Sequence, residues 1–136
     1  MRILRAGIAL VVSSALLAAA GSALAAATSI RLAGPHVNAF HSSFHYVASG
    51  FAGGQANHAW AWETPANRPC AATYRQEIRR GRIFLFVSKP LARNRSFSFV
   101  IRFFARNRES HHLCAYVVNQ RSGATYARAE ASWRNE

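Results

Sequence analysis

Apolar and polar residues alternate with a period of two along most of the chain after residue 27, a pattern typical of β-strands with one buried face. The clearest example is TYARAEASW, in which Thr125, Ala127, Ala129, Ala131 and Trp133 share a face. Alternation likewise puts Phe44, Tyr46 and Ala48 on one face of residues 40–49, and Phe97, Phe99, Ile101 and Phe103 on one face of residues 96–104. Turn residues such as Gly34-Pro35 and Gly53-Gly54 separate these segments. The pattern predicts seven strands, at residues 28–35, 40–49, 58–63, 82–88, 96–104, 112–118 and 125–133.

One segment follows a different period. In PCAATYRQEIRRG, residues 69–81, Tyr74 and Ile78 lie four positions apart. Proline near the start, Arg79 and Arg80 near the end and Gly81 as a stop are typical of a short helix. About seven strands with one short helix after Cys70 predict an all-β fold, an antiparallel β-sandwich.

The N-terminus carries the features of a signal peptide. A basic start is followed by an uncharged apolar run, and Ala23-Leu24-Ala25 has the small-x-small form that signal peptidase cleaves. We expect a signal helix within residues 1–25, cleavage after Ala25, and one domain at residues 26–136 that is secreted, periplasmic or on the cell surface. An uncleaved membrane anchor is the alternative. After cleavage, no membrane span is expected.

The stretch ESHHLCAYVVNQ raises a choice between a metal site and a structural strand. In a strand, His112 and Cys114 face one way and His111 the other, so Cys70, Cys114 and His112 could supply three zinc ligands. An exported pair of cysteines is more often oxidised. We therefore predict a disulfide between Cys70 and Cys114, with Trp60 or Trp62 packed near it, and no metal.

The order of these features resembles a known family. WAWE precedes Cys70, and CAATYRQE is followed much later by LCAYVVN and one more alternating strand. This is similar to small exported bacterial immunoglobulin-like domains, which mostly have no assigned activity. The resemblance implies an immunoglobulin-like sandwich and little about function. The chain departs from the pattern at His112, where such domains often carry the tyrosine of the tyrosine corner.

The charge of the expected mature chain is strongly positive. The 17 Lys and Arg residues less Arg2 and Arg5 leave 15 cations against 5 acids, all Glu, a net charge of +10. Such a charge attracts polyanions, and a coding bias toward Arg and Ala with little Lys explains the same composition equally well. The candidate polyanion-binding residues are Arg79, Arg80, Arg82, Arg93, Arg95, Arg106 and Arg108. The ARNR turns at 92–95 and 105–108 should lie at opposite ends of a strand about 26 Å long, and Asn94 and Asn107 are able to adopt the left-handed conformation there.

Catalytic patterns are weak in this chain. It contains no Gly-x-Ser-x-Gly motif and no Asp to orient a histidine, and Glu77 has a structural role available as a partner of Arg80 or Arg75. His41 and His45 would share a strand face, and His58 or His36 could add a third metal ligand, but two loosely spaced histidines are weak evidence for a metal site, and a polar solvated strand face is the preferred interpretation.

These observations predict no catalytic residues, no cofactor and no enzyme activity. We expect a non-catalytic exported domain that binds or structures something at the cell envelope or outside the cell. The alternative is a cationic module that binds an anionic envelope polymer or glycan through its arginine clusters, with nucleic acid disfavoured as a partner. A metal-binding protein or an enzyme is a third hypothesis.

Overall fold

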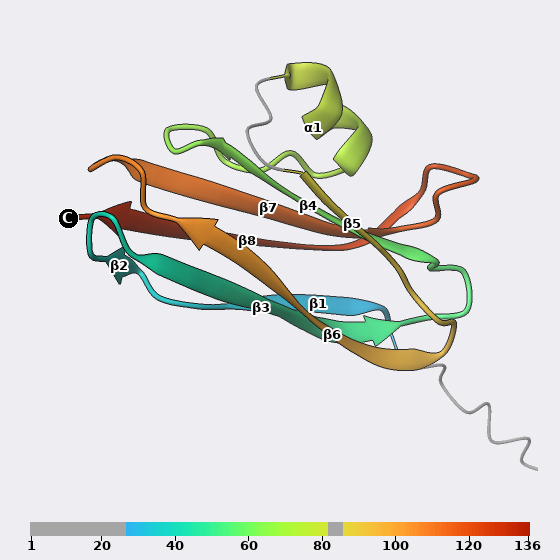
Figure 1. Ribbon diagram of the computed structural model, residues 1–136. Coiled ribbons are helices and arrows are strands. Elements are labelled where there is room, and N and C mark those ends of the chain that lie inside the picture. Colours follow the sequence, from blue (N-terminus) through green and yellow to red (C-terminus); the bar gives the residue numbers. More distant parts are fainter. Residues whose placement is uncertain (1–26, 82–85) are drawn as a thin grey trace, which may run out of the picture.

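The computed structural model describes residues 27–81 and 86–136. Two β-sheets pack face to face, and one short helix lies on the outside of the larger sheet (Figure 1). The elements are β1 (Ser29–Ala33), β2 (Val37–Asn38), β3 (Ser43–Ala52), β4 (His58–Pro65), α1 (Tyr74–Arg80), β5 (Phe86–Pro90), β6 (Arg95–Phe104), β7 (Ser110–Val118) and β8 (Thr125–Asn135).

The strands form a three-stranded sheet, β1-β3-β6, and a five-stranded sheet, β2-β8-β7-β4-β5. All pairings are antiparallel except that of the two-residue strand β2 with β8, which is parallel. The predicted antiparallel sandwich is therefore confirmed. The additional strand β2 was not predicted from the sequence, because two residues are too few to show an alternating pattern. The predicted signal helix and the part of the predicted strand 82–88 before Phe86 lie outside the described residues.

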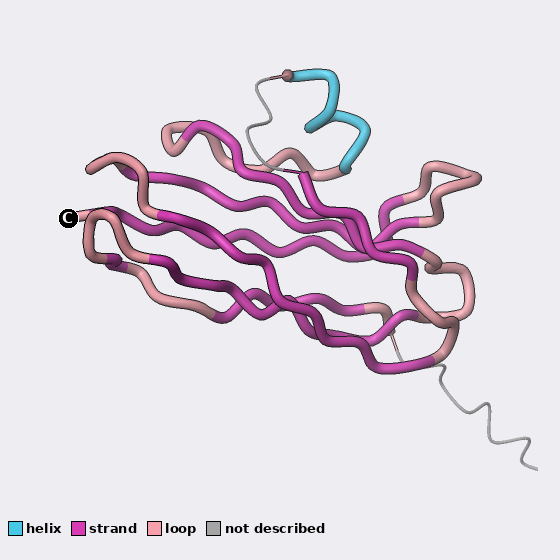
Figure 2. Tube along the Cα trace, in the orientation of Figure 1, coloured by secondary structure: helices cyan, strands magenta, loops and turns pink. Residues whose placement is uncertain are grey.

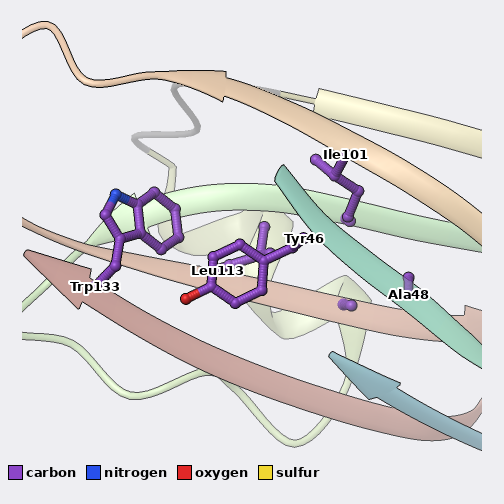
Figure 3. Packing of buried hydrophobic residues seen from close by; sticks show 7 residues of the cluster. Tyr46, Ala48, Ile101, Leu113 and Trp133 are labelled. Atoms are coloured by element: carbon purple, nitrogen blue, oxygen red, sulfur yellow. The ribbon is translucent and has the colours of Figure 1, made fainter. Parts of the chain in front are cut away.

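The core between the sheets is built from the inward faces that alternation predicts. Tyr46, Ile101, Leu113 and Trp133 point into the space between the two layers (Figure 3) and are at most 4% exposed. Burying one large apolar side chain contributes roughly 1.5–3 kcal/mol. The period-two pattern of β3, β6 and β8 therefore arises because every second side chain of these strands packs in this core.

A second apolar cluster covers the outer face of the five-stranded sheet. Trp62 of β4 and Tyr116 of β7 stack at 5.2 Å between ring centroids, and Tyr74 of α1 packs against Trp60 at 4.9 Å. The Cys70–Cys114 disulfide belongs to this cluster and joins the segment before α1 to β7. The prediction that Trp60 or Trp62 packs near the disulfide is confirmed, since both belong to the cluster that contains Cys70 and Cys114. Unlike the inter-sheet bridge of antibody domains, however, this bridge lies outside the sandwich core.

The helix is shorter than residues 69–81. It begins at Tyr74, where the Thr73 hydroxyl accepts a hydrogen bond from the backbone N–H of Gln76, a typical N-cap. Gly81 ends it with a φ of 71°, which glycine adopts at little cost. The residues before Thr73 are not helical, and Cys70 among them is bonded to Cys114 of β7.

Of the two residues on the predicted apolar face of the helix, one is buried and the other is exposed. Tyr74 is buried, but Ile78 is 41% exposed and Glu77 is fully buried instead. The Glu77 carboxylate accepts hydrogen bonds from the backbone N–H of Ala71 at 2.6 Å and from Arg68 at 3.0 Å. The predicted ion pair with Arg80 is present at 3.6 Å. These partners compensate the burial of the charge.

Candidate binding site

The two adjacent histidines of β7 lie on opposite faces of the five-stranded sheet, as the strand pattern predicts. His111 faces the sandwich interior and stacks on Trp133 at 5.5 Å. His112 faces the helix side, among the residues of the disulfide. Each pairs with a glutamate from a neighbouring strand, His111 with Glu63 of β4 and His112 with Glu130 of β8. The stretch therefore builds two separate polar clusters.

The cluster around His112 is structural. Its Nε2 lies 2.9 Å from Glu130 Oε2, and its Nδ1 lies 2.7 Å from Ser132 Oγ. The hydrogen bond with His112 is the main cause that lowers the pKa of Glu130 below its ordinary value. His112 therefore occupies the position of the corner tyrosine with a different set of partners.

The three atoms proposed as zinc ligands do come together. The ligand atoms of Cys70, Cys114 and His112 lie within 4.8 Å of one another. The two sulfurs are bonded to each other in a disulfide, and a disulfide offers no thiolate to a metal. Within the described parts of the chain no other such group of three potential ligands occurs. The geometry therefore supports the structural interpretation of this stretch.

The cluster around His111 ties β4 to the loop between β6 and β7. His111 Nδ1 contacts Glu63 Oε1, and Nε2 lies 2.7 Å from Asn107 Oδ1. Asn107 Oδ1 also accepts from the backbone N–H of Glu109, and its Nδ2 donates to the Glu109 carboxylate at 3.2 Å. Of the two turn asparagines, Asn94 adopts the left-handed conformation with a φ of 53°, and Asn107 does not.

A pocket of about 740 Å³ opens beside this cluster. It lies between the ends of β4 and β6 and the β6–β7 loop, and the described pairs of β4 with β5 run from His58 to Trp62. In the described part of the chain, the β4 residues beyond Trp62 therefore pair with β7 alone. The walls include Glu63, Arg102, Phe103, Phe104, Arg106 and His111.

The charges in the pocket are unequally compensated. Glu63 is paired with His111, and Glu109 is hydrogen-bonded to Asn107. Among the described residues, Arg102 and Arg106 form no ion pair. The pocket lining thus includes two arginines together with Phe103 and Phe104. This arrangement can hold an anionic group next to an apolar one.

The predicted arginine groups lie in separate places. Arg93 and Arg95 lie at the β5–β6 turn, and Arg106 and Arg108 in the β6–β7 loop, at the two ends of a ten-residue strand about 33 Å long (Figure 2). Arg79 and Arg80 belong to α1 on the outer side of the five-stranded sheet. Arg82 lies outside the described residues. The prediction that the two ARNR segments lie at opposite ends of one strand is confirmed.

The histidine pair of the metal hypothesis does not share a strand face. His41 lies before β3 in a turn with a φ of 62° and stacks on Phe40 at 3.8 Å, while His45 lies in β3 opposite Arg102. The strand begins at Ser43 and not at Phe40, which explains the error. His36 contacts the carbonyl of Ser132 at 3.4 Å, and His58 opens β4.

Sequence reasoning missed the pocket residues Glu63, Arg102 and His111. The alternation in β6 places Arg102 on the solvent face, and that signal is readable from the sequence. The proximity of Glu63 to His111 is not, because it depends on the pairing of β4 with β7 across 48 residues.

No helix in the described residues is long and apolar enough to cross a membrane.

Comparison with solved structures assigns the fold. The CARDB domain of the PF1109 protein from Pyrococcus furiosus, crystallised in complex with di-metal ions, superposes with a TM-score of 0.55 at 9% identity, over 79% of this chain and 91% of that one. CARDB domains are immunoglobulin-like sandwiches. The fold is immunoglobulin-like. The solution structure of the same CARDB domain gives the same TM-score over 79% of this chain and 93% of that domain.

A Niemann-Pick type C2 protein from Japanese carpenter ant gives a TM-score of 0.49 at 10% identity, over 82% of this chain and 95% of that one. No protein-family model and no curated protein matches the sequence. At these identities the likeness concerns the fold alone, and the predicted sandwich class is confirmed.

Proposed function

We propose that this protein is an exported, non-catalytic binding module that holds a small ligand in the pocket at the β6–β7 end of the sandwich. The observation that carries the proposal is a concave site with two uncompensated guanidinium groups next to aromatic walls. Its volume of about 740 Å³ lies in the range of small-molecule sites. The signal-type N-terminus and the disulfide support export.

The polar cluster at the pocket supports binding over catalysis. A histidine that acts as general base needs a ring nitrogen free to accept a proton from a nucleophile or water. In His111 one nitrogen contacts Glu63 and the other Asn107. The cluster instead fixes the β6–β7 loop to β4, and so shapes the pocket wall.

The expected ligand carries a carboxylate or phosphate beside an apolar chain. Arginine binds both anions through paired N–H donors, and Phe103 and Phe104 would contact the apolar part. Decanoate and decyl phosphate are suitable probes, with decanol as the neutral counterpart. We expect calorimetric titration of the protein at residues 26–136 to give binding of the anionic probes, with decanol weaker.

The matched variants are Arg106→Gln in the pocket and Arg121→Gln in the exposed loop after β7. Both remove one positive charge. Loss of a hydrogen bond to a charged group should raise the Kd of decanoate roughly tenfold in the first variant and leave it unchanged in the second. Absence of binding by every probe, or equal weakening by both substitutions, would contradict the proposal.

A second candidate function is the binding of an anionic polymer, and the position of the acidic residues favours it. None of the five glutamates lies in β1, β3 or β6. The arginine groups named from the sequence are spread over three parts of the molecule, so they do not by themselves locate such a polymer.

A further inference from the structure

The outward face of the three-stranded sheet is rich in hydroxyl groups. Strand alternation puts five serines on it, and side chains on the same face recur about every 6.6 Å along a strand. The paired rows across β1, β3 and β6 are Ser29/Phe51/Ser96, Arg31/Ser49/Ser98 and Ala33/Val47/Val100, followed by His45/Arg102 and Ser43/Phe104 across β3 and β6.

This face, the Ser/Arg face, carries positive charge and no acid. Arg31, His45 and Arg102 are exposed on it. All five glutamates lie in or beside the elements of the other layer: Glu63 in β4, Glu77 in α1, Glu109 before β7, Glu130 in β8 and Glu136 after β8. The molecule therefore has one side on which cations are not compensated.

Arg31 of β1, in the row Arg31/Ser49/Ser98, is held in position by a hydrogen bond. Arg31 Nε donates a hydrogen bond to Ser49 Oγ at 2.9 Å, and Arg31 forms no ion pair within the described residues. Its two terminal nitrogens remain available for an anion. A depression of about 400 Å³ lies beside it, with Ser29, Ser49 and Ser96 in the walls.

Apolar side chains lie between the polar ones. Val100 is 41% and Phe104 48% exposed on this face. Alternating hydroxyl, guanidinium and apolar groups match a sugar chain that carries anionic groups, hydroxyls and C–H surfaces in turn. A nucleic acid would need a row of aromatic rings for base stacking. The two phenylalanines of this face, Phe51 and Phe104, are eight residue positions apart along the paired strands and form no such row.

We propose that the Ser/Arg face binds a linear anionic polysaccharide, with Arg31 and Arg102 as the contacts to its acidic groups. This site is separate from the pocket except at Arg102 and Phe104, which belong to both. The proposal stands on charge complementarity and hydroxyl content and does not depend on the pocket ligand.

The test measures binding to heparin, an anionic polysaccharide, with the protein at residues 26–136. The variant Arg31→Gln/Arg102→Gln is compared with Arg79→Gln/Arg121→Gln, which removes the same charge from α1 and from the loop after β7. We expect the Kd to rise roughly fivefold for each arginine removed from the face and much less in the control. The single variant Arg31→Gln isolates the face, because Arg31 does not line the pocket.

Amide chemical shifts of the unsubstituted protein give a second measurement that does not depend on a variant folding. Addition of a heparin hexasaccharide should shift amides of β1, β3 and β6 and leave α1 unchanged. Equal weakening by both double variants, shifts centred on α1, or competition by oligo(dT) as effective as heparin at equal charge would overturn the proposal.

Discussion

At the residue scale, the buried groups of the helix side are linked by a few specific bonds. The Tyr116 hydroxyl donates to the carbonyl of Ala71 at 2.7 Å, from a fully buried position in β7. Burial, with a further contribution from the Glu77 carboxylate, raises the pKa of Tyr116 well above its ordinary value. A neutral phenol is therefore a condition for docking the segment before α1.

This shift predicts a loss of stability in alkali. The pKa is raised in the folded state, so the stabilisation is fully present below the unfolded value near 10.0 and is lost as the pH rises above it. We expect the free energy of unfolding to fall between pH 9 and pH 11, as measured by urea denaturation. In Tyr116→Phe the fall should be smaller, although the variant loses about 1 kcal/mol at pH 8 with the hydrogen bond.

Tyr46, whose pKa is also raised by burial, remains in that variant and should keep part of the pH dependence. Parallel stability curves for the two proteins over this pH range would show that Tyr116 is not a source of the alkaline loss.

The sequence identifies single residues well when their role follows from the strand period. Trp133 and Tyr46 are in the core as alternation predicts. Glu77 is the opposite case: an acid in a polar helix predicts exposure, but backbone and arginine donors from residues outside the helix stabilise it in a buried position. Such compensation depends on tertiary contacts and leaves no local pattern.

At the element scale, the segment from Cys70 through α1 is held to the sheet by one covalent link and one apolar cluster. The helix has seven residues, too few to be stable alone. The disulfide closes a separation of 44 residues, for which chain entropy gives about 4 kcal/mol. The bridge is therefore expected to be the main restraint on this element.

We expect the double variant Cys70→Ala/Cys114→Ala to lose about 2–5 kcal/mol of unfolding free energy. Urea denaturation followed by tryptophan fluorescence measures this, since Trp60 and Trp62 belong to the cluster that the segment covers. The two substitutions remove both thiols, so no unpaired cysteine complicates the result. A change of less than about 1 kcal/mol would mean that apolar packing alone holds the segment.

At this scale the sequence predicts the type of each element better than its ends. The strand at residues 40–49 begins at Ser43, because the chain first turns at His41 with a positive φ. The helix begins at Tyr74, after the N-cap Thr73, and not at Pro69. The start of β3 is also marked by a hydrogen bond to a distant residue, from His41 N–H to the carbonyl of Ala105.

At the scale of the whole molecule, the two sheets differ in charge. One outer face carries Arg31 and Arg102 without acids, and the other is covered by α1 and the disulfide-linked segment. The pocket opens where β6 meets the ends of β4 and β7. The proposed small-ligand pocket and the proposed polymer-binding face are thus neighbouring surfaces that share Arg102 and Phe104.

Export is tested by the intact mass of the protein recovered from the expressing cells, alkylated under denaturing conditions without reductant. We expect a chain that begins at Ala26, two hydrogens lighter than the reduced form and unalkylated. A chain that retains residues 1–25 would favour the membrane anchor. Two alkylated thiols would return Cys70, Cys114 and His112 to consideration as metal ligands.

The strand pattern, the inward faces of β3, β6 and β8 and the pairing of the two cysteines can be read from the amino-acid sequence alone. They follow from a local period of two and from having only two cysteines to join. Three features become visible only in the folded protein: His111 meets Glu63 and Asn107, Glu77 is buried, and the acids avoid one sheet. They depend on sheet pairing, which joins residues far apart in sequence, and the sequence does not state which strands become neighbours.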